Sequence, residues 1–165
     1  MSEDWEMLEP LHDFILIRAD ECKKIHRNIS RICDFARKGN SVKISDDLLF
    51  CVADPLRWVP CYNPSTEENH YGLNYSGITL IKKEGAEIAA KIFNAWINLF
   101  CLGPEILSLR GMFVYDDEVN APGDEAYERI TIKRDIFLKI LQSLAEMASQ
   151  VVESNGEYYI LHSGY

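Results

Sequence analysis

Four histidines and five cysteines are the side chains of this sequence best suited to acid–base, nucleophilic or metal chemistry. No two of the cysteines have the Cys-x-x-Cys spacing of a zinc ribbon or a thioredoxin motif. Their odd number leaves at least one thiol unpaired, and unpaired thiols are typical of a reducing compartment. We therefore expect reduced cysteines and a cytoplasmic protein.

Two groups of these side chains have the residue types of a metal or catalytic site. Cys22 and His26 lie four positions apart, which puts both on one face of a helix. Cys51, Cys61 and His70 lie in an irregular stretch, where either cysteine and the histidine would also make a nucleophile pair. Neither group has further ligands at metal-site spacing. We therefore expect no metal and no cofactor, and we interpret Cys22 as part of a half-buried helix face.

The sequence has no P-loop, dinucleotide fingerprint, Gly-x-Ser-x-Gly elbow or His-Glu-x-x-His zinc motif. His162 lies at the end of the last predicted strand, and a histidine at a strand end can line a pocket, although such a residue more often bonds to the backbone. We therefore predict that the chain is not an enzyme. The alternative is a small-molecule-binding protein or hydrolase with a pocket near His70 or His162.

The most distinctive polar feature is an acidic stretch without Lys or Arg between Tyr115 and Glu128. The chain as a whole has a formal net charge of -9, which argues against nucleic-acid binding because phosphates require a basic surface. The stretch is interpreted as a docking surface for a basic protein partner, with a solvated hairpin tip as the alternative. The candidate partner-binding residues are Asp116, Asp117, Glu118, Asp124 and Glu125.

Residues 53–71 contain three prolines, two asparagines and a serine, so we predict a long loop there. Long loops of this kind often carry function, either as an interface or as the wall of a pocket. Trp58 and Tyr62 are the candidate anchors for a partner in this loop. The alternative is that these two aromatic side chains cover the edge of a sheet.

Hydrophobic periodicity predicts the elements that position these residues. Residues 12–19 are ambiguous between strand and helix, and acidic residues at the start followed by an apolar stripe predict a helix over 20–38. Short apolar runs predict strands over 48–52 and 78–81. Two further strands, over 105–115 and 127–132, should pair as a hairpin whose tip is the acidic stretch. The remaining elements are a helix with Glu84 and Glu87 in its first turn that runs to residue 100, a helix over 135–154 and a terminal strand over 157–162.

The predicted fold is α+β, an antiparallel or mixed sheet of about five strands with three helices packed on it. Residues 1–165 should form a single globular domain in which 1–11 are an N-terminal arm. Trp5, Leu8 and Leu11 are the arm residues able to dock onto the body. No stretch reaches the roughly 18 apolar residues of a membrane helix, so we expect no membrane association. A homodimer remains open.

Several short stretches resemble those of small bacterial immunity proteins of polymorphic toxin systems. They are Gly77–Ile81, Ala95–Phe100, Pro104–Ile106, Leu109–Gly111 and Leu161–Tyr165. This resemblance implies a non-enzymatic cytoplasmic inhibitor, usually acidic, that occludes the active site of a toxin. The expected function is therefore an immunity-type inhibitor of a basic toxin domain.

Overall fold

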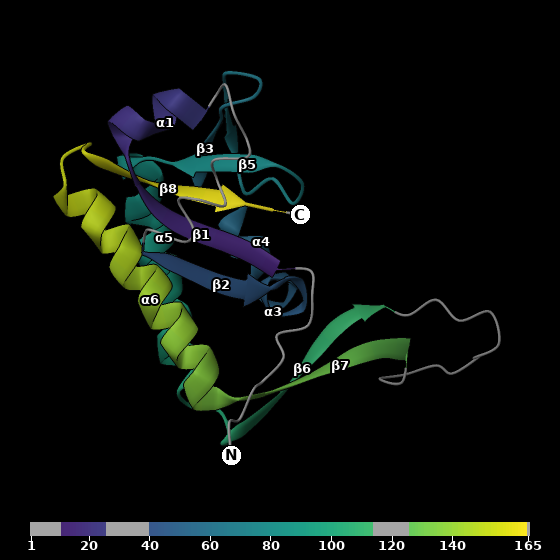
Figure 1. Ribbon diagram of the computed structural model, residues 1–165. Helices are drawn as coiled ribbons and strands as arrows, with labels where there is room; N and C mark the ends of the chain where they lie inside the picture. The colour runs from purple at the N-terminus through teal and green to yellow at the C-terminus, as the bar shows by residue number, and fades with distance from the viewer. Residues whose placement is uncertain (1–10, 26–39, 114–125, 165) are drawn as a thin grey trace, which may run out of the picture.

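The computed structural model describes residues 11–25, 40–113 and 126–164, and an antiparallel sheet of six strands forms its centre (Figure 1). The strand order is β2-β1-β8-β5-β3-β4. The strand that comes last in the sequence, β8, therefore lies inside the sheet and pairs with β1 and β5. The bounds are β1 Leu11–Arg18, β2 Ser41–Ser45, β3 Pro60–Asn63, β4 Glu68–Tyr71, β5 Ile78–Ile81 and β8 Tyr158–Ser163.

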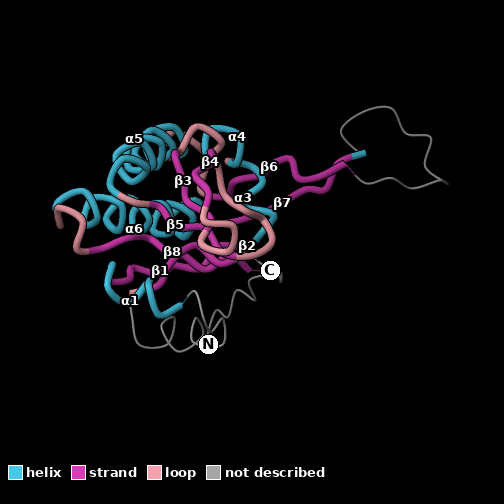
Figure 2. The backbone as a smooth tube through the Cα atoms, turned by 90° about the horizontal axis from the view of Figure 1, so that it is seen from above, coloured by secondary structure: helices cyan, strands magenta, loops and turns pink. Residues whose placement is uncertain are grey.

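Two long helices, α5 (Lys83–Phe100) and α6 (Arg134–Glu153), pack against each other and cover one face of this sheet (Figure 2). Each presents the apolar stripe expected of an amphipathic helix, and both sequence predictions are confirmed. The helix α1 (Ala19–Ile25) lies on the opposite face, where Cys22 joins a second cluster with Ile15, Ile17, Ile78, Leu80 and Leu161. The side chains of β1 therefore alternate between two apolar environments.

The predicted hairpin of β6 (Ile106–Phe113) and β7 (Tyr127–Lys133) is confirmed, but it forms a two-stranded sheet of its own. Figures 1 and 2 show it extending away from the six-stranded body. The half nearest the body is anchored by Leu107, which is 4% exposed, and by the Arg134 guanidinium, which donates to the Gly103 carbonyl oxygen at 2.8 Å. A register shift between Arg110 and Phe113 makes the bulge that Gly111 indicates in the sequence.

The prediction of a strand over 48–52 is wrong, because these residues belong to the helix α3 (Asp46–Cys51). The Ser45 hydroxyl accepts a hydrogen bond from the Leu48 N–H at 3.4 Å, and two aspartates occupy the first turn. A serine cap and acidic first-turn residues both stabilise a helix N-terminus. These start signals outweigh the strand propensity of the short apolar run that follows them.

The prediction of a long loop over 53–71 is also wrong, because this stretch contains the helix α4 (Ala53–Leu56) and the hairpin of β3 and β4. Its prolines mark the boundaries of these elements. Pro55 lies in the first turn of α4, Pro60 begins β3, and Pro64 follows the end of β3. None of these positions requires a backbone N–H from the proline.

The α+β class is confirmed, but the predicted numbers of elements are not. Within its described residues the chain has a six-stranded sheet, a two-stranded sheet and five helices, where about five strands and three helices were expected. The segment with ambiguous periodicity is the strand β1. Of the helix predicted over 20–38, the described part ends at Ile25, and the remaining residues lie outside the described chain.

The helices of the described chain include none with the length and apolar character needed to cross a membrane.

Gly85 provides a test of how closely α5 packs on the sheet. A Cβ at this position would overlap the carbonyl oxygen of Pro60. Replacing glycine by alanine in an open helix stabilises it by about 1 kcal/mol. We expect Gly85→Ala to lower the free energy of unfolding instead, by about 1–3 kcal/mol, because overpacking forces the backbone apart. Urea denaturation measures the change.

The matched control is Ala95→Gly, the reverse exchange at an exposed position of the same helix. It should lose no more than about 1 kcal/mol, through helix propensity alone. A Gly85→Ala variant that is more stable than the wild type would show that α5 and β3 are not in contact there.

Candidate functional site

Two buried histidines and an aspartate form a continuous hydrogen-bonded chain at one end of the central sheet. His12 Nδ1 lies 2.9 Å from His162 Nε2, and His12 Nε2 lies 2.8 Å from Asp46 Oδ1. Both imidazole rings are fully buried, while the aspartate side chain is 14% exposed. The chain therefore runs from the interior of the sheet to its surface.

The register of β1 and β8 brings the two rings together. Phe14 is the direct partner of His162, and His12 lies two residues along the same face of β1. The rings stack with centroids 5.1 Å apart and an interplanar angle of 12°. Asp46 reaches them from the first turn of α3, immediately after the Ser45 cap. The Tyr75 ring also contacts His12, with the two rings perpendicular and their centroids 5.6 Å apart.

The hydrogen-bonding capacity of these three side chains fixes which atom donates and which accepts in each hydrogen bond. A carboxylate only accepts, so His12 donates its Nε2–H to Asp46. When His12 is neutral, its Nδ1 accepts a hydrogen bond from the Nε2–H of His162. In this tautomer the Nδ1 atom of His162 carries a lone pair and no proton. This atom has no hydrogen-bond partner among the described residues. Burial, followed by the neighbouring His12, lowers the pKa of His162 to about 3, so this ring is neutral near pH 7.

The cavities among the described parts of the chain lie apart from this group. The linings of four well-formed cavities among the described residues do not include His12, Asp46 or His162. Buried polar side chains that bond to one another fix a particular packing of the elements that carry them. The arrangement is therefore suited to joining β1, β8 and α3.

The two predicted cysteine–histidine groups are poorly suited to nucleophilic or metal chemistry. Cys61 and His70 are direct partners across β3 and β4, so the predicted pair is brought side by side. Burial raises the pKa of the Cys61 thiol to about 12 and that of Cys51 to about 11, which leaves no thiolate at neutral pH. Burial likewise raises the pKa of Cys22 to about 12, and its predicted partner His26 lies outside the described residues. Among the described side chains, no three potential ligands gather as a metal site.

The outer half of the β6–β7 hairpin presents a group of exposed apolar and aromatic side chains. Met112, Phe113 and Tyr127 are 47%, 57% and 38% exposed. Phe113 and Tyr127 are register partners whose rings meet edge to face at 5.3 Å, and the Arg110 guanidinium lies 4.9 Å from the Tyr127 ring centre. Aromatic residues, Met and Arg are the types enriched at protein–protein interfaces. We call these four residues the hairpin patch.

The hairpin patch adjoins the predicted acidic surface in the sequence. Phe113 and Tyr127 are the last paired residues before the connection that carries these acids. All five candidate acids fall outside the described residues. They are Asp116, Asp117, Glu118, Asp124 and Glu125.

The two predicted aromatic anchors lie elsewhere. Trp58 is 65% exposed in the turn between α4 and β3, and Tyr62 is half-buried on β3, with the Lys82 ammonium 4.1 Å from its ring centre. In the strand order β3 is near the opposite edge from β2, and Figure 1 shows it far from the hairpin. The structure therefore does not bring these aromatic residues together with the base of the acidic connection.

Sequence reasoning missed His12, Asp46 and the hairpin patch. The contact between His12 and His162 depends on strand order, because 150 residues separate them in the sequence. The one local signal was Ser45-Asp46-Asp47, a helix start that places an aspartate at a helix N-terminus. The aromatic ends of the predicted hairpin were visible, but their exposure depends on how far the hairpin extends beyond the body.

No protein-family model, curated protein or solved structure matches this chain. The resemblance to immunity proteins therefore stays a prediction.

The buried His162 should give the folding stability a specific pH dependence. Its pKa is lower in the folded state than the usual 6.5 of an unfolded chain, so between pH 6.5 and about 3 the unfolded state binds one proton more. Stability contributed by this ring is present above pH 6.5 and falls as the pH is lowered through that window, by about 1.4 kcal/mol per pH unit. Urea unfolding between pH 7 and 4.5 measures the slope.

We expect His162→Phe, and separately His162→Gln, to remove this slope, so that each variant loses less stability than the wild type on acidification. The matched control is Thr79→Val, a buried register partner of His162 that does not titrate. That variant should be less stable at every pH and keep the wild-type slope. Equal slopes in all four proteins would contradict a buried neutral His162.

Proposed function

We propose that this chain is a non-enzymatic acidic binding protein, of the kind that immunity proteins exemplify, which inhibits a basic toxin domain by covering it. The proposal further assigns the binding surface to the hairpin patch and the acidic connection that follows it. One observation carries the assignment: aromatic and apolar side chains are exposed on a hairpin that projects from the body. Burial of exposed aromatic rings of this size by a partner would stabilise the complex.

The charge of the chain supports a basic partner. The formal net charge is -9, and five acids lie within the connection between β6 and β7. Complementary charge accelerates encounter, while buried aromatic and Arg anchors supply most of the affinity. The two properties occur together at this hairpin, so it has both requirements of a fast, tight inhibitor.

The rival function, an enzyme or small-molecule-binding protein, requires a cavity that converges on a histidine. The linings of the four cavities described above contain no histidine, and the buried thiols are protonated. These observations favour a binding protein over this rival.

Retention of the partner by variant baits tests the assignment. Wild-type protein immobilised from its own cells should retain a basic protein, and the bait Phe113→Ser/Tyr127→Ser should bind it at least about thirtyfold more weakly, because the loss of even one hot-spot residue costs about 2 kcal/mol. Quantitative mass spectrometry of the eluates measures the ratio. The control bait is Trp58→Ser, which removes an aromatic ring that is more exposed than either hairpin ring and lies beside β3, far from the hairpin; it should retain as much as the wild type. Loss with Trp58→Ser and not with the hairpin variant would move the interface to β3.

The acidic connection should act on the rate of association. The variant Asp116→Ser/Asp117→Ser/Glu118→Ser should associate with the purified partner up to about tenfold more slowly at low salt, and its rate should vary less with salt. Surface plasmon resonance across a salt series measures both. The control Glu84→Ser/Glu87→Ser/Glu153→Ser removes the same number of exposed charges from α5 and α6. An effect of equal size in both variants would show that the net charge, and not the connection, guides the encounter.

A further inference from the structure

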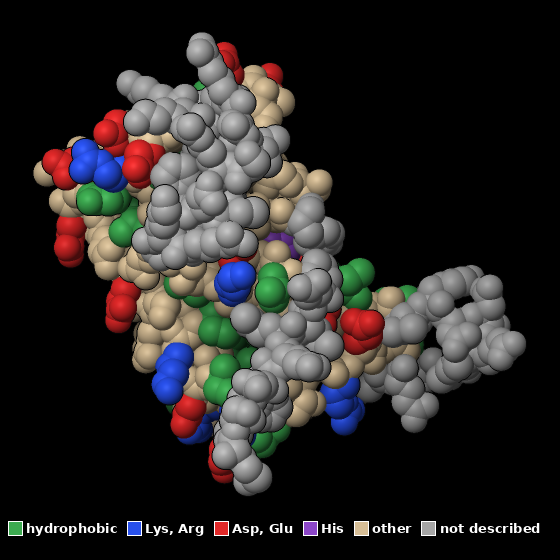
Figure 3. All heavy atoms as spheres, viewed as in Figure 1, with side chains coloured by type: hydrophobic (Ala, Val, Ile, Leu, Met, Phe, Trp, Pro, Cys, Tyr) green, Lys and Arg blue, Asp and Glu red, His purple; other side chains and the backbone are tan. Residues whose placement is uncertain are grey.

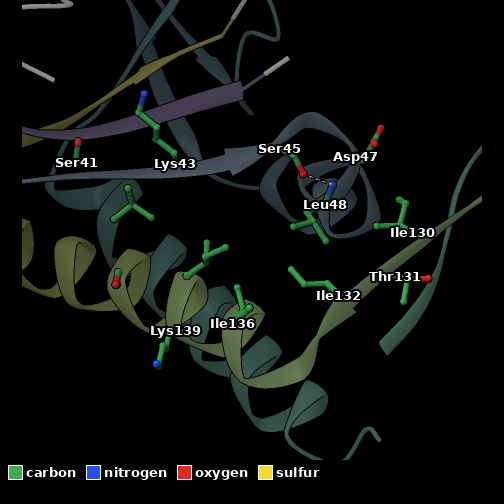
Figure 4. Close-up of a pocket in the computed structure, with 13 residues that line it drawn as sticks. Ser41, Lys43, Ser45, Asp47, Leu48, Ile130, Thr131, Ile132, Ile136 and Lys139 are labelled. Carbon is green, nitrogen blue, oxygen red and sulfur yellow. Dashed lines mark hydrogen bonds between the residues drawn. The ribbon is translucent and has the colours of Figure 1, made fainter. Parts of the chain in front are cut away.

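An apolar groove runs between the edge strand β2, the helix α3, the strand β7 and the helix α6 (Figure 4). Its volume is about 500 Å³, and six aliphatic side chains form most of its wall. They are Val42, Leu48, Ile130, Ile132, Ile136 and Ile140. Figure 3 shows hydrophobic side chains gathered between β2 and α6 on this face of the molecule. We call this feature the α6 groove.

The polar groups of the α6 groove lie at its rim. Figure 4 shows Lys43 on the β2 side and Lys139 on the α6 side, with their amino groups directed away from the aliphatic wall. Lys43 also lies 3.7 Å from the Asp13 carboxylate, while Lys139 is an exposed residue. Asp47 also lines the groove, at the α3 end, while Lys139 lies at the α6 end (Figure 4). An occupant should therefore be mainly apolar and place its negative charge near Lys139, away from Asp47.

The start of the described chain lies at one end of this groove. Leu11, the first residue of β1, is the direct register partner of Ser45, and Ser45 lines the groove. Partners in an antiparallel pair have Cα atoms about 5 Å apart. Residues 1–10 precede Leu11, and ten extended residues reach about 33 Å at about 3.3 Å each. The stretch of α6 from Ile136 to Ser143 that lines the groove needs only about 10 Å of that reach.

The composition of residues 1–10 matches what the groove requires. Four side chains are apolar and four are acidic, and the segment has no Lys or Arg. Trp5 and Leu8 are three positions apart, so one turn of helix or an irregular segment can direct both towards the same wall. Being joined to the body at Leu11, the segment competes for the groove at a high effective concentration.

We propose that residues 1–10 of the same chain occupy the α6 groove, with Trp5 and Leu8 against Ile136 and Ile140 and with acidic side chains towards Lys139. The occupied groove would hide its aliphatic wall from water and connect the start of β1 to β7, the strand that carries half of the hairpin. This inference concerns a different surface from the hairpin patch and does not depend on the proposed function.

Nuclear Overhauser effects in the intact 165-residue chain test the proposal without any truncation. The sample carries ¹³C-methyl isoleucine and protonated tryptophan in an otherwise deuterated protein, and a Trp5→Ser variant assigns the Trp5 indole signals. We expect cross-peaks from the Trp5 indole protons to the methyl groups of Ile136 and Ile140. We also expect these two methyl resonances to shift in Trp5→Ser.

The matched controls are the methyl groups of Ile88 and Ile97, which are half-buried isoleucines of α5 outside the groove. Their resonances should not move in Trp5→Ser. Unchanged Ile136 and Ile140 signals, or Trp5 cross-peaks to other methyl groups alone, would overturn the proposal. A mixture of labelled and unlabelled chains identifies a second copy as the occupant, because the cross-peaks would then join different chains, and that result would overturn it as well.

Discussion

The position of β8 between β1 and β5 is the constraint on which the rest of the structure depends. A strand formed by the last residues of the described chain supplies hydrogen-bond partners to two strands that come more than 75 residues earlier. Without β8 the sheet would be divided into β2-β1 on one side and β5-β3-β4 on the other. The strand β8 also supplies Ile160 to the apolar core under α5 and α6 and Leu161 to the cluster on the opposite face. The core therefore becomes complete only when the two ends of the sequence meet.

The His12–His162 contact follows from the same pairing and makes it more specific. The two rings come within hydrogen-bond distance only in this register, because a slip of one residue would turn His162 towards the opposite face of the sheet. Asp46 then ties the pair to α3, which also contacts the middle of β6 through the hydrogen bond from the Cys51 thiol to the Arg110 carbonyl oxygen. Polar groups at the end of the sheet thus link its centre to the element that we propose for binding. The close approach of the Tyr75 carbonyl to Gly164, where a Cβ would not fit, closes the same end of the sheet.

The sequence predicts those parts of the fold in which local periodicity and burial agree. The helices α5 and α6 have long apolar stripes, and the hairpin has alternating runs on both sides of a turn signal, so these elements were predicted correctly. The α3 helix was mistaken for a strand because five apolar residues show no period, while the deciding signal was the Ser45 cap that precedes them. The prolines of residues 53–71 were interpreted as a loop because their roles at element boundaries depend on pairing partners far along the chain. The histidine chain depends on strand order in the same way, and strand order is not encoded in any local pattern.

The molecule thus combines a body closed by β8 with a hairpin whose outer half has little support from that body. Two-stranded hairpins are marginally stable without further packing, and the hairpin patch has high exposure. Native-state amide hydrogen exchange in increasing urea tests this division most directly. The amides of Leu161 and His162 should exchange only through global unfolding, while those of Phe113 and Tyr127 should exchange through local opening with a much smaller free energy. Exchange of the β8 amides at the same low free energy as the hairpin amides would contradict the account, because the C-terminal strand would then not be what closes the body.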